Sequence, residues 1–199
     1  MLIAVDVDST LYDTDRCTAD IMAEAIAKYA GNNGEMDAAA RAAVNEYIEQ
    51  AEGSVLRWFQ PKYLIPEAIA TLKRYQEEHT DIVYVILTKR DALHKCYEYL
   101  FKDTGLTFAD IYQARDYRSK AEACREEGID ILVDDAAENY FDHVGAQERW
   151  SDYDTRFILY TKHTTYNSAS GQRALEQARY KMTDWAQFPE LLETIKKDM

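Results

Sequence analysis

Short apolar runs alternate with segments of helical periodicity along most of this chain. The runs have the length of strands, and the segments between them repeat apolar positions with the period of an amphipathic helix. This alternation is typical of βαβ units, in which helices cover both faces of a parallel sheet. The pattern therefore predicts an α/β fold with a Rossmann-like, doubly wound parallel sheet. The predicted strands are Leu2–Val5, Ile82–Leu87, Ile111–Tyr112, Ile129–Val133 and Phe157–Tyr160, and the helices between them are Pro66–Glu78, Ala92–Phe101, Ser119–Glu127 and Ala137–Val144.

The interval between the first two strands is about seventy residues long, far more than one crossover helix needs. It contains two helical stretches, near Asp15–Tyr29 and Met36–Glu49, separated by a Gly-Asn-Asn-Gly turn at residues 31–34. An all-helical insertion at this point of a doubly wound sheet would lie over the site as a cap. We expect two further helices near Gly171–Tyr180 and Trp185–Lys196. The predicted division is a core of residues 1–15 and 66–199 and a helical cap of residues 16–65.

Composition and charge narrow the class of protein. Hydrophobic residues make up 47% of the chain and Gly and Pro are few, so the chain is expected to fold around a proper core. A formal net charge of −13 argues against a nucleic-acid polymer or an anionic membrane surface as the main partner. The three cysteines are scattered without a CxxC pair, no apolar run reaches the ~20 residues of a membrane span, and no leader pattern is evident. These features predict a cytoplasmic protein.

Two aspartates follow the first predicted strand. Asp6 and Asp8 are two residues apart, so their side chains point to the same side of an extended segment. Open α/β sheets bind their ligands beyond the carboxyl ends of the strands, which is where this pair falls. Such a pair can hold a divalent metal or divide the roles of nucleophile and general acid. The alternative is a strand followed by an ordinary Asp-Ser-Thr turn or helix cap.

Three further features fall at the same predicted edge. Thr88 directly follows the second strand and precedes Lys89, Lys120 lies near the start of a helix, and Asp134-Asp135 follows the apolar run of the fourth strand. Each has an ordinary interpretation when taken alone: a capping hydroxyl, a solvated lysine, an acidic turn. Two carboxylate pairs that close two buried strands at the same edge, however, repel each other unless a cation lies between them. Oxygen ligands without a nearby His or Cys favour Mg²⁺ over zinc.

The ordered set of motifs resembles the haloacid dehalogenase-like superfamily of phosphohydrolases. That pattern is DxDx(T/V), a strand ending in Thr or Ser, a Lys, and an apolar strand ending in DD; here it covers roughly residues 1–16 and 66–161. The resemblance implies that Asp6 is the nucleophile that forms an aspartyl-phosphate and that Asp8 is the general acid and base. It further implies a phosphate site of Thr88 and Lys120, with Lys89 as an additional candidate. The implied Mg²⁺ ligands are Asp6, the backbone carbonyl of Asp8, Asp134 and Asp135, with Asp134 favoured for direct contact.

Within that superfamily the chain resembles the 5′(3′)-deoxyribonucleotidase-like branch. The shared features are the short helical cap, a DD motif without a following GxxxxD, and a Tyr166-Asn167 loop after the last predicted strand. Trp58 and Phe59 would then stack on a base and Arg57 would meet a phosphate or carbonyl; alternatively the two rings anchor the cap. Leu87-Thr88-Lys89-Arg90 departs from the small-residue run of that branch.

The sequence thus predicts a Mg²⁺-dependent phosphomonoesterase for a small phosphorylated metabolite, with a (deoxy)nucleoside monophosphate as one candidate. A sugar-phosphate phosphatase or phosphomutase on the same core is the alternative within enzymes. A non-catalytic binding module of the same fold is the alternative of another class.

Overall fold

Six parallel strands form one sheet, and its order places β1 and β4 side by side at the middle. The computed structural model describes residues 1–30, 36–52, 54, 58–90, 94–136, 154–161 and 169–199. The strand order is β3-β2-β1-β4-β5-β6, and every pairing is parallel. This confirms the predicted doubly wound α/β fold. The strands are β1 (Leu2–Val5), β2 (Val83–Thr88), β3 (Ile111–Gln113), β4 (Ile131–Asp134), β5 (Arg156–Tyr160) and β6 (Tyr180–Met182).

Several features predicted from the sequence lie outside the described residues. They are the turn at residues 31–34, Arg57, the helix expected over residues 137–144, and the Tyr166-Asn167 loop.

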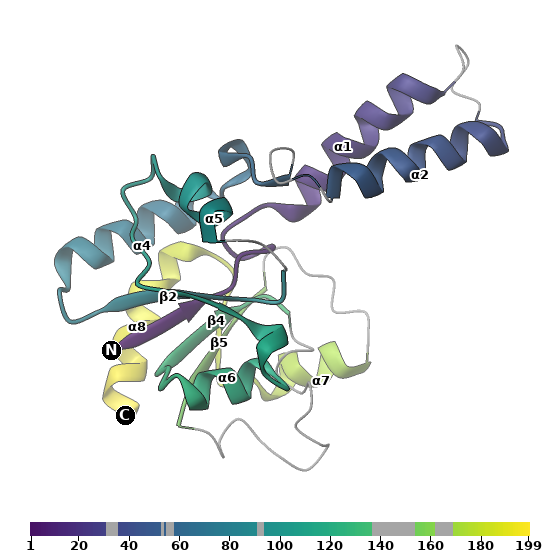
Figure 1. Ribbon diagram of the computed structural model, residues 1–199. Helices are drawn as coiled ribbons and strands as arrows, with labels where there is room; N and C mark the ends of the chain where they lie inside the picture. The colour runs from purple at the N-terminus through teal and green to yellow at the C-terminus, as the bar shows by residue number, and fades with distance from the viewer. Residues whose placement is uncertain (31–35, 53, 55–57, 91–93, 137–153, 162–168) are drawn as a thin grey trace. The chain divides into compact units, whose positions relative to one another are not determined.

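Helices cover both faces of the sheet (Figure 1). Side chains alternate between the two faces along each strand, so Ala4, Val85 and Leu132 form one layer with the buried residues of α6. Figure 1 shows α4 and α8 on the opposite face, where Tyr75 of α4 meets Phe188 of α8 with ring centroids 6.1 Å apart. The inner strands are buried on both sides, which explains their continuous apolar runs. The helices are α4 (Pro66–Glu78), α6 (Lys120–Glu126), α7 (Ala169–Gln177) and α8 (Phe188–Asp198), with 3₁₀ turns at Ala114–Asp116 and Trp185–Gln187.

Backbone contacts divide the chain into two compact units. The α/β unit comprises residues 1–12, 65–91 and 104–199 and contains the sheet; the helical unit comprises residues 13–64 and 92–103. In the helical unit α1 and α2 form a hairpin in which Tyr29 and Tyr47 meet edge to face at 6.0 Å. Whether residues 16–65 act as a cap on a core of residues 1–15 and 66–199 stays a prediction. The elements of the helical unit are α1 (Thr14–Tyr29), α2 (Ala38–Glu52), the 3₁₀ turn Pro61–Tyr63 and α5 (His94–Phe101).

The C-terminal region differs from the sequence prediction. The helix expected to reach Tyr180 ends at Gln177, and Tyr180 instead begins the edge strand β6. Tyr180 and Met182 are buried while Lys181 is exposed, which is the alternation of a half-buried strand. In only three residues, the two-residue alternation of a strand cannot be distinguished from the pattern of the helix that precedes it.

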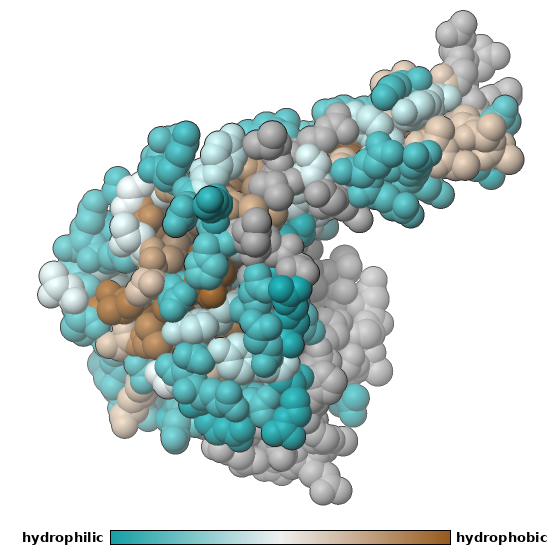
Figure 2. Space-filling view, in the orientation of Figure 1, coloured by the Kyte–Doolittle hydropathy of each residue, from teal (hydrophilic) through white to brown (hydrophobic). Residues whose placement is uncertain are grey.

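One outer helix of the α/β unit has a polar surface, and the cysteines of both units are buried. The outer side of α6 exposes Arg125 and Glu126 and is hydrophilic in Figure 2. Cys17, Cys96 and Cys124 are free thiols and all are buried. Burial raises the pKa of Cys124 to about 12, so this thiol is uncharged at neutral pH. Within the described residues no helix has the length and apolar character needed to cross a membrane.

A tight turn follows β1 directly. The amides of Leu11 and Tyr12 both donate to the carbonyl of Val7, at 2.9 Å each, and Ser9 donates to the carbonyl of Tyr12 at 2.7 Å. Ser9 has φ of 57°, in the left-handed region that disfavours residues with a Cβ. The turn therefore reverses the chain immediately after Asp8.

We expect Ser9→Val to lower the free energy of unfolding by about 1–2 kcal/mol, because a β-branched residue is especially strained at positive φ. Ser9→Gly removes the Cβ and should stay within about 1 kcal/mol of the wild type. Urea denaturation of the three proteins measures both values. Equal stability of the Val and Gly variants would contradict a left-handed Ser9.

Candidate active site

Asp6 and Asp134 lie side by side because the two strands that carry them are paired in register. Val5 of β1 is opposite Val133 of β4, and the amide of Asp6 donates to the carbonyl of Val133 at 2.9 Å. The next residue of each strand is therefore an aspartate at the same carboxyl edge. Both side chains are buried, as is Asp135. The sequence predicted this juxtaposition from the strand ends alone.

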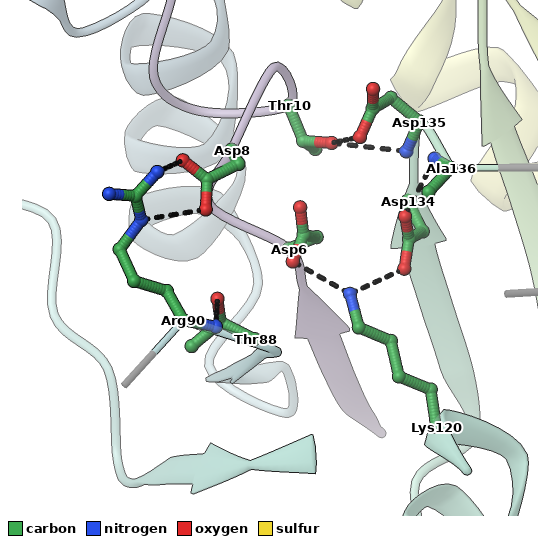
Figure 3. A network of polar contacts seen from close by, with 9 residues as sticks. All are labelled: Asp6, Asp8, Thr10, Thr88, Arg90, Lys120, Asp134, Asp135 and Ala136. Atoms are coloured by element: carbon green, nitrogen blue, oxygen red, sulfur yellow. Dashed lines mark hydrogen bonds and ion pairs between the residues drawn. The ribbon is translucent and has the colours of Figure 1, made fainter. Parts of the chain in front are cut away.

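Lys120 joins these two carboxylates. Its Nζ donates to Oδ1 of Asp6 at 2.7 Å and to Oδ2 of Asp134 at 2.6 Å (Figure 3). Lys120 is the first residue of α6, whose preceding residue Ser119 caps the helix by accepting from the amide of Glu122 at 3.1 Å. Burial lowers the pKa of Lys120, but Asp134 and Asp6 together outweigh it and leave that pKa above its ordinary value. Lys120 is thus a buried, charged ammonium.

The buried cluster carries more negative than positive charge. Asp6, Asp134 and Asp135 each offer a carboxylate oxygen, and these atoms lie within 4.8 Å of one another. Burial raises the pKa of Asp6 well above its usual range; Lys120 opposes that shift, while Asp134 and the other nearby aspartates add to it. Three carboxylates around one ammonium are the donors that a hard divalent cation prefers. The residues therefore fit a Mg²⁺ site.

Thr10 and Trp185 form hydrogen bonds next to the acidic cluster. The amide of Asp135 donates to Oγ1 of Thr10 at 3.2 Å, and Nε1 of Trp185 donates to the backbone carbonyl of Thr10 at 3.3 Å. The amide of Ala136 donates to Oδ1 of Asp134 at 2.8 Å. The sequence motif included Thr10, but neither its contact with Asp135 nor the distant Trp185 was predicted.

Thr88 and Arg90 lie at the end of β2, on the other side of β1. Thr88 is buried, and its Oγ1 accepts from the amide of Arg90 at 3.1 Å. The guanidinium of Arg90 pairs with Asp8 through Nε to Oδ2 at 2.9 Å and Nη2 to Oδ1 at 2.5 Å. Figure 3 shows the Asp8 carboxylate turned toward Arg90 and away from Lys120. Sequence reasoning selected Lys89, which is exposed, and missed Arg90.

The structure brings most of the predicted site residues to one edge of the α/β unit. Asp6, Asp8, Thr88, Lys120 and the Asp134-Asp135 pair follow β1, β2 and β4 or begin α6. Their roles in binding and catalysis stay predictions.

The aromatic candidates Trp58 and Phe59 are packed inside the helical unit. Both rings are buried, and Phe59 meets Tyr97 edge to face at 5.3 Å. The carbonyl of Trp58 lies 3.9 Å from Sγ of Cys17. Both rings are therefore buried, with Phe59 packed against Tyr97, and their stacking on a substrate stays a prediction.

Several solved structures have a similar architecture. A predicted phosphoglycolate phosphatase from Haemophilus somnus superposes with a TM-score of 0.60 at 12% identity, over 96% of this chain and 97% of that one. A β-phosphoglucomutase from Clostridium difficile gives 0.54 at 10% identity, over 99% and 97%. A 2-haloacid dehalogenase from Pseudomonas syringae gives 0.51 at 17% identity, over 97% and 98%.

The chain has the haloacid dehalogenase-like fold. No protein-family model and no curated protein sequence matches the chain. At these identities the likeness establishes the fold. The resemblance seen in the sequence motifs is therefore supported at the level of the superfamily fold, and the deoxyribonucleotidase-like branch is not confirmed.

Lys120→Met should lower the free energy of unfolding by about 3–5 kcal/mol in metal-free buffer, because it leaves buried carboxylates without their cation. Lys89→Met removes the same charge from an exposed position and should change stability by less than about 0.5 kcal/mol. Urea denaturation at neutral pH compares the two variants. Similar losses for both would show that the buried ammonium contributes nothing specific.

Proposed function

We propose that this protein is a Mg²⁺-dependent phosphomonoesterase that acts on a small phosphorylated metabolite through an aspartyl-phosphate on Asp6. The observation that carries the proposal is the bridge of Lys120 between Asp6 and Asp134 at the carboxyl edge of a haloacid dehalogenase-like sheet. A buried aspartate in contact with a lysine, with a second aspartate as the general acid and base, is the arrangement that covalent phosphoryl transfer needs.

Asp6 supplies the nucleophile in this proposal. Lys120 contacts Oδ1 of Asp6 and stabilises the carboxylate, and a carboxylate oxygen of Asp6 attacks phosphorus. The bond from phosphorus to the ester oxygen breaks, and Asp8 gives that leaving oxygen a proton. Asp8 then accepts a proton from the water that attacks phosphorus, and the bond from phosphorus to the Asp6 oxygen breaks. The products are an alcohol and inorganic phosphate, and both aspartates return to their initial states.

Thr88 and Lys120 hold the phosphoryl group. The amide of Arg90 donates to Oγ1 of Thr88, which fixes the hydroxyl so that its own proton is directed to a phosphate oxygen. Lys120 lies between Asp6 and Asp134, where it offsets the charge of a bound phosphate. Lys89 is exposed beside Thr88 and is an additional phosphate contact in this proposal.

The metal ligands we assign are Asp6, the backbone carbonyl of Asp8, Asp134 and Asp135. Three of these residues offer converging carboxylate oxygens, and Lys120 alone cannot balance their charge. When bound, Mg²⁺ would neutralise charge between the nucleophile and the phosphate. Thr10 holds the backbone of Asp135 and keeps this pair at the end of β4.

The substrate is a small phosphate ester, with a sugar phosphate and a (deoxy)nucleoside monophosphate as equal candidates. The structural neighbours include enzymes named for phosphoglycolate and for phosphoglucose. A phosphomutase on the same residues is the second candidate, because it needs the same nucleophile and acid–base pair. A non-catalytic module is disfavoured, since Asp6, Asp8, Thr88 and Lys120 are all retained.

The free, buried cysteines support a reducing, cytoplasmic location.

Wild-type protein should release phosphate from at least one member of a panel of aryl phosphates, sugar phosphates and deoxynucleoside monophosphates. Asp6→Asn should lower that turnover by at least about a thousand-fold, because an amide oxygen is a poor nucleophile. Phosphate release in the presence of Mg²⁺ measures both proteins.

Asp116→Asn is the matched control, since Asp116 is an exposed aspartate in the 3₁₀ turn after β3. It should keep full activity. Retention of activity by the Asp6 variant would refute the covalent mechanism, and a sugar-phosphate-only profile would exclude the nucleotidase alternative.

Mg²⁺ should raise the melting temperature of the wild-type protein, because an ion that binds only the folded state stabilises it by about 2.7 kcal/mol at a hundred times its Kd. Asp135→Asn should weaken that increase, and EDTA should abolish turnover until Mg²⁺ is restored. Thermal melts with Mg²⁺ or an equal ionic strength of Na⁺ separate binding from screening. Equal melting temperatures in the two salts would contradict a Mg²⁺ site.

A further inference from the structure

Arg90 engages both carboxylate oxygens of Asp8. The contacts are Nε to Oδ2 at 2.9 Å and Nη2 to Oδ1 at 2.5 Å, which is the parallel, two-bond geometry that only a guanidinium can offer a carboxylate. Such a pair fixes the direction of the carboxylate as well as its distance. The side chains of Arg90 and Asp8 are 21% and 30% exposed, so the pair is shielded from much of the solvent.

The backbone holds Arg90 in place. Arg90 follows the end of β2 by two residues, and its amide donates to the buried hydroxyl of Thr88. Asp8 sits at the start of the hydrogen-bonded turn after β1. Because β1 and β2 are neighbours in the sheet, the guanidinium reaches Asp8 from a fixed position.

The two aspartates of the motif have separate cations. Lys120 holds Asp6 on the side of β4, and Arg90 holds Asp8 on the side of β2 (Figure 3). The carboxylates therefore diverge although they are only two residues apart. This separation matches the two tasks assigned to them, one at phosphorus and the other at the leaving oxygen.

We propose that Arg90 is the positioning residue of the acid–base Asp8. The proposal rests on the proposed function, since it concerns the residue that protonates the leaving group. In the acid form of Asp8 one oxygen carries the proton, so its hydrogen bond from Arg90 opens. That oxygen gives the proton to the ester oxygen, and the other oxygen keeps its hydrogen bond from Arg90. After the phosphoryl group has moved to Asp6, the same oxygen of Asp8 takes a proton from water. Arg90 thus maintains the direction of Asp8 in both of its protonation states.

This role makes a prediction about leaving groups. The ratio kcat/KM reports the first irreversible step, in which the ester bond breaks. A poor leaving group such as phenolate needs a proton from Asp8 in that step, whereas dinitrophenolate leaves without one. A residue that acts through Asp8 is therefore important for phenyl phosphate and dispensable for dinitrophenyl phosphate.

Arg90→Ala should lower kcat/KM at least about thirty-fold for phenyl phosphate and less than about three-fold for dinitrophenyl phosphate. Asp8→Asn should show the same selectivity, and the double variant should equal Asp8→Asn within about two-fold, because both changes remove one function. Arg90→Lys should keep part of the kcat/KM for phenyl phosphate that Arg90→Ala loses. Guanidinium added to the Arg90→Ala protein should likewise restore part of that kcat/KM. Arg118→Ala is the matched control, since Arg118 pairs with Glu122 on the surface, and it should leave both esters unchanged.

The competing roles of Arg90 give different results. A residue that binds the substrate phosphate, or one that only stabilises the fold, would lower kcat/KM equally for both esters and additively with Asp8→Asn. Either outcome would overturn the proposal while leaving the phosphatase function intact. A wild-type protein inactive on every ester would instead refute the proposed function, and this proposal with it.

A spectroscopic measurement tests the ion pair without turnover. In ¹⁵N spectra of the full chain, the Nε–H of Arg90 should exchange slowly with water and should lose that protection in Asp8→Asn but not in Asp116→Asn. An exchange rate that does not respond to Asp8→Asn would show that the pair does not hold Asp8, and would also overturn the proposal.

Discussion

The contact of the Lys120 ammonium with Asp6 and Asp134 is the constraint on which the site depends. Lys120 opposes the rise that burial causes in the pKa of Asp6, and the two carboxylates keep the pKa of the buried ammonium above its ordinary value. The same contact ties α6 to the two central strands. The packing of helix on sheet and the charge state of Asp6 are therefore determined together, so the polar groups are as much a part of the core arrangement as the apolar ones.

Parallel pairing explains how much of the site follows from sequence. Asp6, Thr88 and Asp134 each end an apolar run, and such runs become neighbouring buried strands whose carboxyl ends share an edge. Lys120 is different, because a lysine at a helix start is ordinary on its own, and only its position in the ordered set of motifs selected it. The edge strand at Tyr180 was missed since three residues cannot display a period.

The sequence does not predict which polar side chains pair with each other. Lys89 and Arg90 are adjacent cations, and nothing in their order tells which one turns inward; the geometry of the chain after β2 decides that Arg90 reaches Asp8. Trp185 lies 175 residues from Thr10 in the chain, so its contact is a product of tertiary folding. The substrate likewise depends on surfaces whose shape is not encoded in a short motif.

Trp185 places a native fluorophore against the turn that follows Asp8. Its indole N–H donates to the carbonyl of Thr10, and its ring packs against Tyr160 and Phe188 in a buried environment. Indole emission is sensitive to hydrogen bonding and to the local electric field. A rearrangement of the turn that follows Asp8, or a change in charge around Asp135, therefore alters the fluorescence emission of Trp185.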